Sequence, residues 1–101
     1  MKCGSAHEAQ VLRWVAQQAQ LVLAAKRVIL YGSRARGDAD ERSDFDIAID
    51  TDCPDKIPDF LDILEHNPIT LLGFDVVVLA SVTEDFRARI LAEGRDITDD
   101  E

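Results

Sequence analysis

Three aspartates are the residues of this sequence best suited to chemistry. Asp44 and Asp46 stand one residue apart, and Asp75 interrupts the apolar run Phe74–Leu79. Side chains at positions i and i+2 of a strand point to the same face, so the first two carboxylates would stand about 7 Å apart at their Cα atoms. Two like charges at that spacing disfavour each other's ionisation unless a cation lies between them. The pair therefore predicts a cation site, and the alternative is a solvent-facing strand edge.

Asp75 extends this prediction. A lone aspartate inside an apolar strand is costly to bury unpaired, so it needs a partner. If its strand lies beside the strand of Asp44 and Asp46, three carboxylates meet. Oxygen-rich clusters of that kind select Mg²⁺ or Mn²⁺. Two such ions, about 3.5–4 Å apart, clamp the entering and leaving oxygens of a phosphoryl transfer.

A Gly-Ser pair supplies a complementary feature. Gly32 and Ser33 follow the short apolar run Val28–Tyr31, which is typical of a strand buried on both faces. Glycine lets the backbone approach a ligand closely, and the N–H groups after it can bind a phosphate. The Ser33 hydroxyl adds a donor. Gly-Ser pairs are common in loops, so this feature gains meaning only beside the aspartates.

Together these residues form a recognisable motif. The segment Gly32-Ser33-Arg34-Ala35-Arg36-Gly37, followed by Ser43-Asp44-Phe45-Asp46-Ile47, resembles the signature of the DNA polymerase beta-like nucleotidyltransferase superfamily: Gly-Ser, about ten residues, then Asp-x-Asp. Its fuller form is similar to the minimal nucleotidyltransferases (MNT), antitoxin-type proteins encoded beside HEPN-domain toxins. The resemblance covers nearly the whole chain and includes the later aspartate in the right order.

The resemblance implies a role for each matching residue. Asp44 and Asp46 correspond to the two metal-bridging carboxylates. Asp75 corresponds to the carboxylate that holds the catalytic metal and polarises the acceptor hydroxyl. Gly32 and Ser33 correspond to the turn that binds the β- and γ-phosphates of the nucleotide.

Arginines and a serine of the motif complete the candidate site. Arg36 matches the motif arginine, and a role on the triphosphate suits a guanidinium. Its alternative is an ion pair with a nearby acid: Asp38, Asp40 or Glu41. Ser43 joins the nucleotide-binding residues and is expected to shape the loop by bonding backbone groups. For Arg34 and Arg42, phosphate contact and solvated charge both stay open.

The resemblance also implies an activity. It is a metal-dependent transfer of a nucleoside monophosphate, AMP from ATP, to a hydroxyl, with two Mg²⁺ (or Mn²⁺) ions as cofactors. The expected acceptor is a tyrosine of a cognate HEPN toxin, which makes the chain the antitoxin in a hetero-oligomeric pair. Two alternatives stay open: an antitoxin that neutralises a basic partner by binding alone, and a nucleotidyltransferase for a small molecule such as an aminoglycoside.

The charge and hydrophobicity of the chain narrow the classes of molecule that it is expected to bind. The chain has 101 residues, 11 basic and 20 acidic, for a net charge of −9. Such a surface repels phosphate backbones, so direct nucleic-acid binding is not expected. No run approaches the roughly 18 apolar residues of a membrane span, and no secretory signal is evident. Cys3 and Cys53 are interpreted as reduced thiols of a cytoplasmic protein, and with two distant histidines they make no zinc site.

The elements that position these residues alternate along one expected domain, residues 1–101. The Ser5-x-x-Glu8 spacing predicts a capping box and a helix over Ala6–Lys26, with Trp14 at the edge of its apolar stripe as core packing or a partner surface. Strands are expected at residues 28–31, 45–50 and 74–79, with one helical turn after Ser33. A second helix starts near Pro58 and ends before Pro68.

The last predicted helix follows Ser81-Val82-Thr83-Glu84, a second capping-box pattern, and has Phe86, Ile90 and Leu91 on its apolar face. Gly94 is expected in the left-handed conformation at its C-terminus, and the acidic tail 99–101 is expected to fray. The order α-β-β-α-β-α predicts an α/β (α+β) fold: a small mixed β-sheet flanked by helices, as in the nucleotidyltransferase fold.

Overall fold

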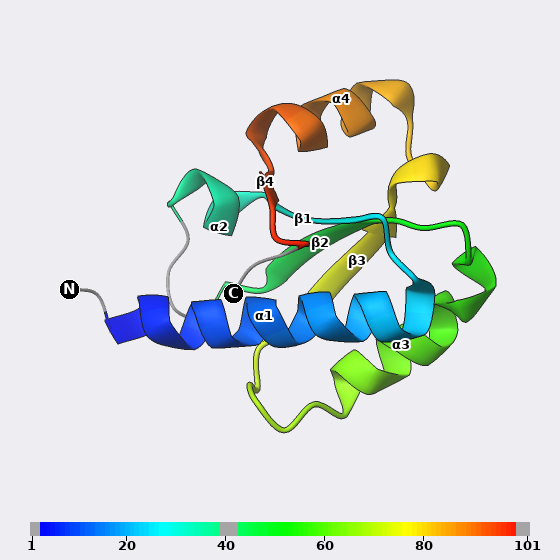
Figure 1. Cartoon of the computed structure of the whole chain (residues 1–101). Helices are drawn as coiled ribbons and strands as arrows, with labels where there is room; N and C mark the ends of the chain where they lie inside the picture. The colour runs from blue at the N-terminus through cyan, green and yellow to red at the C-terminus, as the bar shows by residue number, and fades with distance from the viewer. Residues whose placement is uncertain (1–2, 39–42, 99–101) are drawn as a thin grey trace.

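The computed structural model describes residues 3–38 and 43–98, and side chains from residue 7 onward. Figure 1 shows one four-stranded sheet between helices. The elements, in chain order, are α1 (Cys3–Leu23), β1 (Arg27–Tyr31), α2 (Ser33–Arg36), β2 (Phe45–Asp50), a 3₁₀ turn (Pro54–Lys56), α3 (Ile57–Glu65), β3 (Phe74–Val78), a second 3₁₀ turn (Leu79–Ser81), α4 (Glu84–Glu93) and β4 (Arg95–Asp96). The predicted fold class is confirmed.

The sheet is mixed, with strand order β3-β2-β1-β4. β1 pairs antiparallel with both β2 and β4, whereas β2 and β3 run parallel. Parallel neighbours need a crossover, and α3 makes it between β2 and β3. The pairing leaves β3 and β4 as the two outer strands of the described sheet.

The two faces of the sheet carry different cores. On one face, α1 and α3 pack over alternate strand residues that include Leu30, Phe45 and Ile47. On the other face, Ile90 of α4 packs with Ile29, Tyr31, Ala48 and Leu79. Figure 1 shows α1 and α3 on the side of the sheet opposite α4. We call these the α1/α3 face and the α4 face.

The burial of residues along β1 and β2 confirms the predictions made for these two strands. All of Val28–Tyr31 is buried, as expected for a strand covered on both sides. β2 occupies the predicted residues 45–50, and its odd-numbered apolar residues enter the α1/α3 core. The even position Asp46 consequently faces α4.

The first helix differs from its prediction at both ends. It begins at Cys3 and ends at Leu23, so Ser5 lies inside the helix and the predicted capping box does not start it. The Glu8 carboxylate instead pairs with Arg34 at 2.8 Å and with Arg95 at 3.8 Å. Glu8, the last residue of the predicted box, is therefore engaged in ion pairs with residues far along the chain.

The other helices follow the expected pattern with specific exceptions. Pro58 lies in the first turn of α3 as predicted, and Phe60 and Leu64 are its buried residues. Leu61 and Leu91, however, are 41% and 43% exposed, so they lie at the borders of their apolar stripes. The N-cap of α4 is Thr83, whose hydroxyl accepts a bond from the Phe86 N–H, and not Ser81.

Gly94 is not in the left-handed conformation. Its φ of −76° and ψ of 160° are extended and lead directly into β4, an element that the sequence did not predict. A Cβ at this position would stand 2.4 Å from the Ile90 carbonyl oxygen and 2.5 Å from Ile29 Cγ2. Close approach of α4 to β1 therefore requires the glycine.

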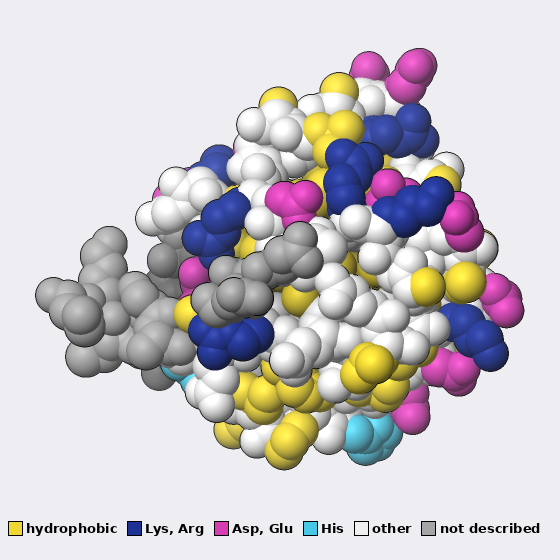
Figure 2. Space-filling model, in the orientation of Figure 1, with side chains coloured by type: hydrophobic (Ala, Val, Ile, Leu, Met, Phe, Trp, Pro, Cys, Tyr) yellow, Lys and Arg dark blue, Asp and Glu magenta, His cyan; other side chains and the backbone are white. Residues whose placement is uncertain are grey.

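Polar and apolar side chains are unevenly spread over the surface. In the orientation of Figure 1, apolar side chains gather along the lower part of the molecule, whereas charged ones cover the upper right (Figure 2). Among the described residues, no helix has both the length and the apolar character needed to cross a membrane. The acidic tail 99–101 lies outside the described residues.

We expect Gly94→Ala to destabilise the fold by about 1–3 kcal/mol, because the added methyl group overpacks the contact between α4 and β1. Urea unfolding followed by circular dichroism measures the change. Ala92→Ser, at an exposed position of α4, is the matched control and should stay within about 0.5 kcal/mol. Equal stability of the two variants would contradict the packing assigned to Gly94.

Candidate active site

The three aspartates predicted to act together lie on neighbouring strands. Asp46 of β2 is paired in register with Asp75 of β3 and, on its other side, with Tyr31 of β1. Residues that are directly paired point to the same face of a sheet. Tyr31, Asp46 and Asp75 therefore form one row across three strands on the α4 face.

Asp44 continues the group at the start of β2. Its Oδ1 accepts a hydrogen bond of 3.2 Å from the N–H of Gly73, the residue before β3. A Cβ on Gly73 would come within 3.1 Å of the same oxygen. The close approach of Gly73 thus lets the Asp44 carboxylate lie at the end of β3, two residues from Asp75.

Asp75 is exposed, which corrects one premise of the sequence analysis. β3 is an outer strand, and its side chains are only partly covered, so the carboxylate is hydrated and not buried in an apolar environment. The prediction that its strand lies beside β2 is confirmed. Contact with solvent leaves Asp75 accessible to an incoming molecule.

Gly32 directly follows Tyr31 and lies at the β1 end of the row. It has φ +74°, in the region that favours glycine, and it directly precedes α2. A Cβ at Gly32 would stand 2.3 Å from Oδ2 of Asp46. The Gly32–Ser33 turn and the Asp46 carboxylate are therefore in contact, as a phosphate-binding turn beside metal ligands would require.

The carboxylates disturb one another's ionisation. Burial, followed by the charges of Asp75 and Asp44, raises the pKa of Asp46, and Arg36 partly opposes this shift. Burial, followed by the charges of Asp75 and Asp46, raises the pKa of Tyr31 to about 12. Tyr31 consequently stays a neutral phenol at any physiological pH.

These groups fit a divalent cation by their chemistry. Three carboxylates on one face provide hard oxygen ligands, and a cation would favour the ionised form of Asp46, whose pKa is raised by burial and then by the neighbouring negative charges. Their oxygens do not all lie within 4.8 Å of one another. Separation is expected of like charges with no cation between them.

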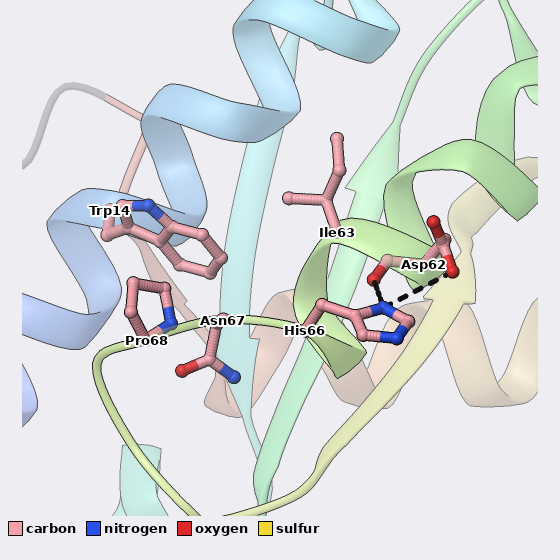
Figure 3. Close-up of a pocket in the computed structure, with 6 residues that line it drawn as sticks. All are labelled: Trp14, Asp62, Ile63, His66, Asn67 and Pro68. Atoms are coloured by element: carbon pink, nitrogen blue, oxygen red, sulfur yellow. Dashed lines mark hydrogen bonds and ion pairs between the residues drawn. The ribbon is translucent and has the colours of Figure 1, made fainter.

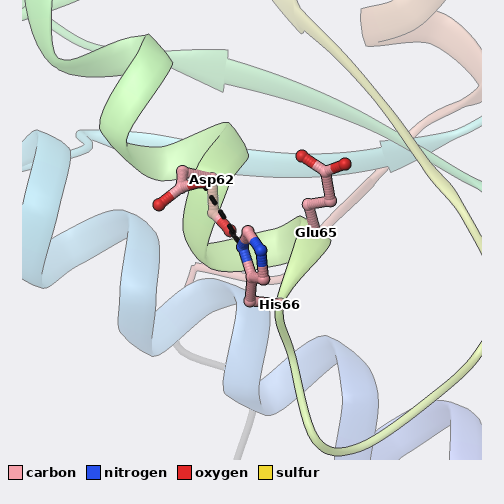
Figure 4. Close-up of side chains that lie close together, drawn as sticks. All are labelled: Asp62, Glu65 and His66. Carbon is pink, nitrogen blue, oxygen red and sulfur yellow. Dashed lines mark hydrogen bonds and ion pairs between the residues drawn. The ribbon is translucent and has the colours of Figure 1, made fainter.

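A different set of ionisable groups does lie that close together. Asp62, Glu65 and His66 of the α3 C-terminus have side-chain atoms within 4.8 Å of one another, and Figure 4 shows the imidazole bonded to Asp62. A backbone hydrogen bond to Asp62 and its charge raise the pKa of His66. All three side chains are exposed and one helical turn apart, which is typical of solvated i, i+3 and i+4 neighbours.

Trp14 and His66 line a shallow hollow. It has a volume of about 500 Å³, and Figure 3 shows Trp14 of α1 facing Pro68 of the loop after α3. The row of carboxylates is not part of its lining. Trp14 is half-buried and packs against the α1/α3 core, as one of its two predicted roles required.

Arg36 is exposed and engaged with acids. Its guanidinium pairs with Asp38 and with Glu93 of α4, each at 3.3 Å. The ion pair with Asp38 was one of the two sequence expectations, and Asp40, Glu41 and Arg42 lie outside the described residues. Because both partners are near the protein surface, the arginine can exchange them for a more strongly charged ligand.

Arg34 is not a solvated charge, so that one of its two sequence expectations was wrong. Only 7% of its side chain is exposed. Its Nε and Nη2 donate to the Ser43 carbonyl at 2.9 and 2.7 Å, its Nη1 pairs with Glu8, and its guanidinium lies 4.1 Å from the Phe45 ring centre. Arg34 therefore holds the segment that leads into Asp44.

Comparisons with known proteins agree with this geometry. The family described as "Polymerase beta, Nucleotidyltransferase" matches residues 15–101. The chain belongs to the polymerase beta nucleotidyltransferase family. The family prediction from the Gly-Ser and Asp-x-Asp motifs is thus confirmed.

Two solved structures share the family fold. One, described as a toxin–antitoxin with AMP-PNP, has a TM-score of 0.68 and 16% identity, over 90% of this chain and 71% of that one. Another, a nucleotidyltransferase described as putative from Sulfolobus solfataricus, has a TM-score of 0.57 and 19% identity, over 96% and 87% of the two chains. No curated protein matches this nucleotidyltransferase at the level of sequence.

Four residues around the site were missed by sequence reasoning. Tyr31 and Gly73 border the aspartates, while Glu8 and Glu93 hold the two motif arginines. Tyr31 could have been predicted to border the site, because it directly precedes Gly32 in the sequence. The partners from α1 and α4 lie 26 and 57 positions from the arginines that they hold, so no local pattern could have found them.

We expect Arg34→Met to destabilise this nucleotidyltransferase by about 3 kcal/mol, because it removes the only charged donor described for the Ser43 carbonyl and leaves Glu8 with only its longer ion pair to Arg95. Arg34→Lys should not restore stability, since an ammonium cannot reproduce the planar, stacked contact. Urea unfolding measures both. Arg13→Met, on the exposed side of α1, is the control and should change stability by less than about 0.5 kcal/mol.

Removing one charge from the row should stabilise the metal-free protein. The pKa of Asp46 is raised above its ordinary 3.8, so the folded state disfavours the ionised form, and this penalty is fully present at neutral pH. Asp46→Asn should therefore raise the thermal midpoint at pH 7 in EDTA. The gain should shrink as the pH falls toward 3.8, where the wild-type carboxyl is protonated. A destabilised Asp46→Asn variant at pH 7 would contradict the repulsion.

Proposed function

We propose that this nucleotidyltransferase transfers AMP from ATP to a tyrosine hydroxyl of a HEPN-domain toxin, and that it acts in the cytoplasm as a single-domain antitoxin. The observation that carries the proposal is the register of β2 and β3, which pairs Asp46 with Asp75 beside the Gly32–Ser33 turn. Membership of the polymerase beta family supports the reaction class. The fold shared with a toxin–antitoxin structure holding AMP-PNP supports the nucleotide and the kind of partner.

Each residue has a role in the proposed reaction. Asp44 and Asp46 would hold two Mg²⁺ ions, and Asp75 would complete the ligand set for one of them. The ions, when bound, neutralise charge on the triphosphate and on the reacting oxygens. Gly32 and Ser33 bind the terminal phosphates through their backbone N–H groups and hydroxyl.

The positive charges and the loop residues assist binding. Arg36 leaves Asp38 and Glu93 to pair with the triphosphate, because guanidinium and phosphate oxygens form strong bidentate bonds. Ser43 shapes the segment before Asp44, where its carbonyl accepts two bonds from Arg34. Its position fixes the first of the three aspartates.

The transfer itself is an in-line displacement. The acceptor oxygen forms a bond to the α-phosphorus of ATP, the bond between that phosphorus and the β-phosphate oxygen breaks, and pyrophosphate leaves. The proton of the acceptor hydroxyl passes to a carboxylate oxygen of Asp75. The exposure of Asp75 on the outer strand suits it to meet a hydroxyl presented by another protein.

Neutralisation by binding alone is a second candidate. The net charge of −9 favours fast, salt-sensitive association with a basic partner, whether or not a nucleotide is transferred. A binding antitoxin would still protect cells after the three aspartates are replaced. An enzymatic antitoxin would not.

The deciding experiment incubates the purified chain with Mg²⁺, each of the four ribonucleoside triphosphates and the protein encoded by the neighbouring gene. Intact-mass spectrometry then reads the product. A partner mass increase of one or more nucleoside monophosphates would establish the transfer and identify the base. A stable complex without a mass increase would favour neutralisation by binding, and the absence of both would favour a small-molecule acceptor such as an aminoglycoside.

We expect Asp44→Ala and Asp46→Ala each to abolish the mass increase, because they remove the bridging ligands of the two ions. Asp75→Asn should lower the rate of transfer by about 10²-fold or more while nucleotide affinity stays near wild type, since its role is toward the acceptor. Circular dichroism verifies folding, and Asp59→Ala, exposed on α3, is the control. Full activity of the Asp44→Ala, Asp46→Ala double variant would rule out the assignment.

A further inference from the structure

Tyr31 has a hydroxyl group that the packing of the fold does not use. The residue is only 7% exposed, because its ring packs on the α4 face with Ala48, Ile90 and the half-buried Phe86. The rings of Tyr31 and Phe86 meet edge to face, with their centres 5.8 Å apart and their planes at 81°. Phenylalanine would make the same ring contacts, so the core does not require the phenolic oxygen.

This hydroxyl has no hydrogen-bond partner among the described residues. No buried side-chain nitrogen or oxygen of these residues lacks a partner, so the phenolic oxygen has to reach solvent. A phenol both donates and accepts hydrogen bonds. A nearly buried side chain therefore presents an unused donor to a molecule that occupies the carboxylate row.

The hydroxyl extends over the carboxylates. Tyr31 is paired directly with Asp46, and Asp46 with Asp75, so the three side chains share one face. After burial, the charge of Asp75 contributes more than that of Asp46 to the raised pKa of Tyr31, although Asp46 is the direct neighbour. Because electrostatic interactions weaken with distance, this order indicates that the phenol leans across β2 toward β3.

The proposed reaction requires a particular group of the substrate above Asp46. The terminal phosphates of ATP would lie at the Gly32–Ser33 turn, which directly follows Tyr31, and the acceptor hydroxyl would lie at Asp75. Because β1 and β3 are the two neighbours of β2, these places are about 10 Å apart, twice the spacing of adjacent strands. The α-phosphorus is bonded to the terminal phosphates and attacked by the acceptor, so it has to lie between them.

We propose that the Tyr31 hydroxyl donates a hydrogen bond to a non-bridging oxygen of the α-phosphate of ATP and is a further catalytic residue of the transfer. The inference rests on the proposed function and makes it more specific. A donor that is fixed in place before the reaction stabilises charge on the transferring phosphoryl group without reorganisation. The contact with Phe86 fixes the ring, and the phenol adds a donor where the ionised carboxylates offer only acceptors.

The first test uses Tyr31→Phe, which keeps the ring against Phe86 and removes only the oxygen. Transfer of AMP to the protein encoded by the neighbouring gene is followed by intact-mass spectrometry, and circular dichroism verifies folding. The variant should lower kcat by about 10- to 100-fold, as expected for one hydrogen bond to a charged group, while the KM for ATP stays within about threefold. Ser81→Ala is the matched control, because it removes an exposed hydroxyl beyond the opposite end of β3 from Asp75.

Sulfur substitution at the α-phosphate separates a direct contact from a packing effect. Sulfur accepts hydrogen bonds more weakly than oxygen, so each diastereomer of adenosine 5′-O-(1-thiotriphosphate) weakens the bonds to one non-bridging position. In one diastereomer, the rate loss caused by Tyr31→Phe should be at least about threefold smaller than with ATP, because the two changes remove the same bond. A packing role would give the same rate loss with ATP and with both thio analogues.

A second measurement does not depend on transfer. Tyr31 is the single tyrosine of the chain, so incorporation of 3-fluorotyrosine gives one fluorine resonance. Mg²⁺ with α,β-methylene-ATP, whose α–β linkage is not cleaved, should shift this resonance. Inorganic pyrophosphate, which has no α-phosphate group, should leave it in place. The shift should be lost in Asp46→Ala.

The outcomes separate this proposal from the function on which it rests. Transfer with an unchanged kcat in Tyr31→Phe, or a rate loss equal for ATP and both thio analogues, would leave the enzyme in place and overturn the role of Tyr31. A fluorine shift specific to the nucleotide, in a chain that transfers nothing, would support the contact and refute the enzyme. The absence of both transfer and shift would overturn both proposals.

Discussion

The pairing of β2 with strands on both sides is the constraint on which the candidate active site depends. It sets Tyr31, Asp46 and Asp75 in one row on the α4 face, while Phe45 and Ile47 fill the α1/α3 core. A slip of one residue would turn the carboxylates into that core and the phenylalanine out of it. The burial of the odd-numbered residues of β2 therefore also determines where the acids of this nucleotidyltransferase lie.

The segment between the Gly-Ser turn and Asp44 needs its own support. Arg34 provides it by binding the Ser43 carbonyl, the Glu8 carboxylate and the face of the Phe45 ring. A guanidinium is the one side chain that offers several donors and a flat surface together. One nearly buried cation thus connects α1 and α2 to the segment that leads into β2.

Repulsion among the carboxylates is retained in the fold. Asp44, Asp46 and Asp75 share one face, and Gly32 and Gly73 bring backbone close against two of them. Such an arrangement costs stability in the metal-free protein and is characteristic of sites that bind charged ligands. The outer position of β3 keeps Asp75 exposed, where water screens its charge.

The sequence alone determined the reaction class, because it depends on local spacing. Asp44 and Asp46 share a face by the period of a strand, Gly32 follows a buried apolar run, and the three strands and main helices follow their hydrophobic patterns. Only the tertiary structure decided what depends on contacts between distant segments. These are the partners of Arg34 and Arg36, the start of α1, the N-cap of α4, the exposure of Asp75 and the strand β4 that follows Gly94. Ion pairs between residues tens of positions apart leave no periodic trace in a sequence, and an apolar stripe shows that a helix is covered but not which strand covers it.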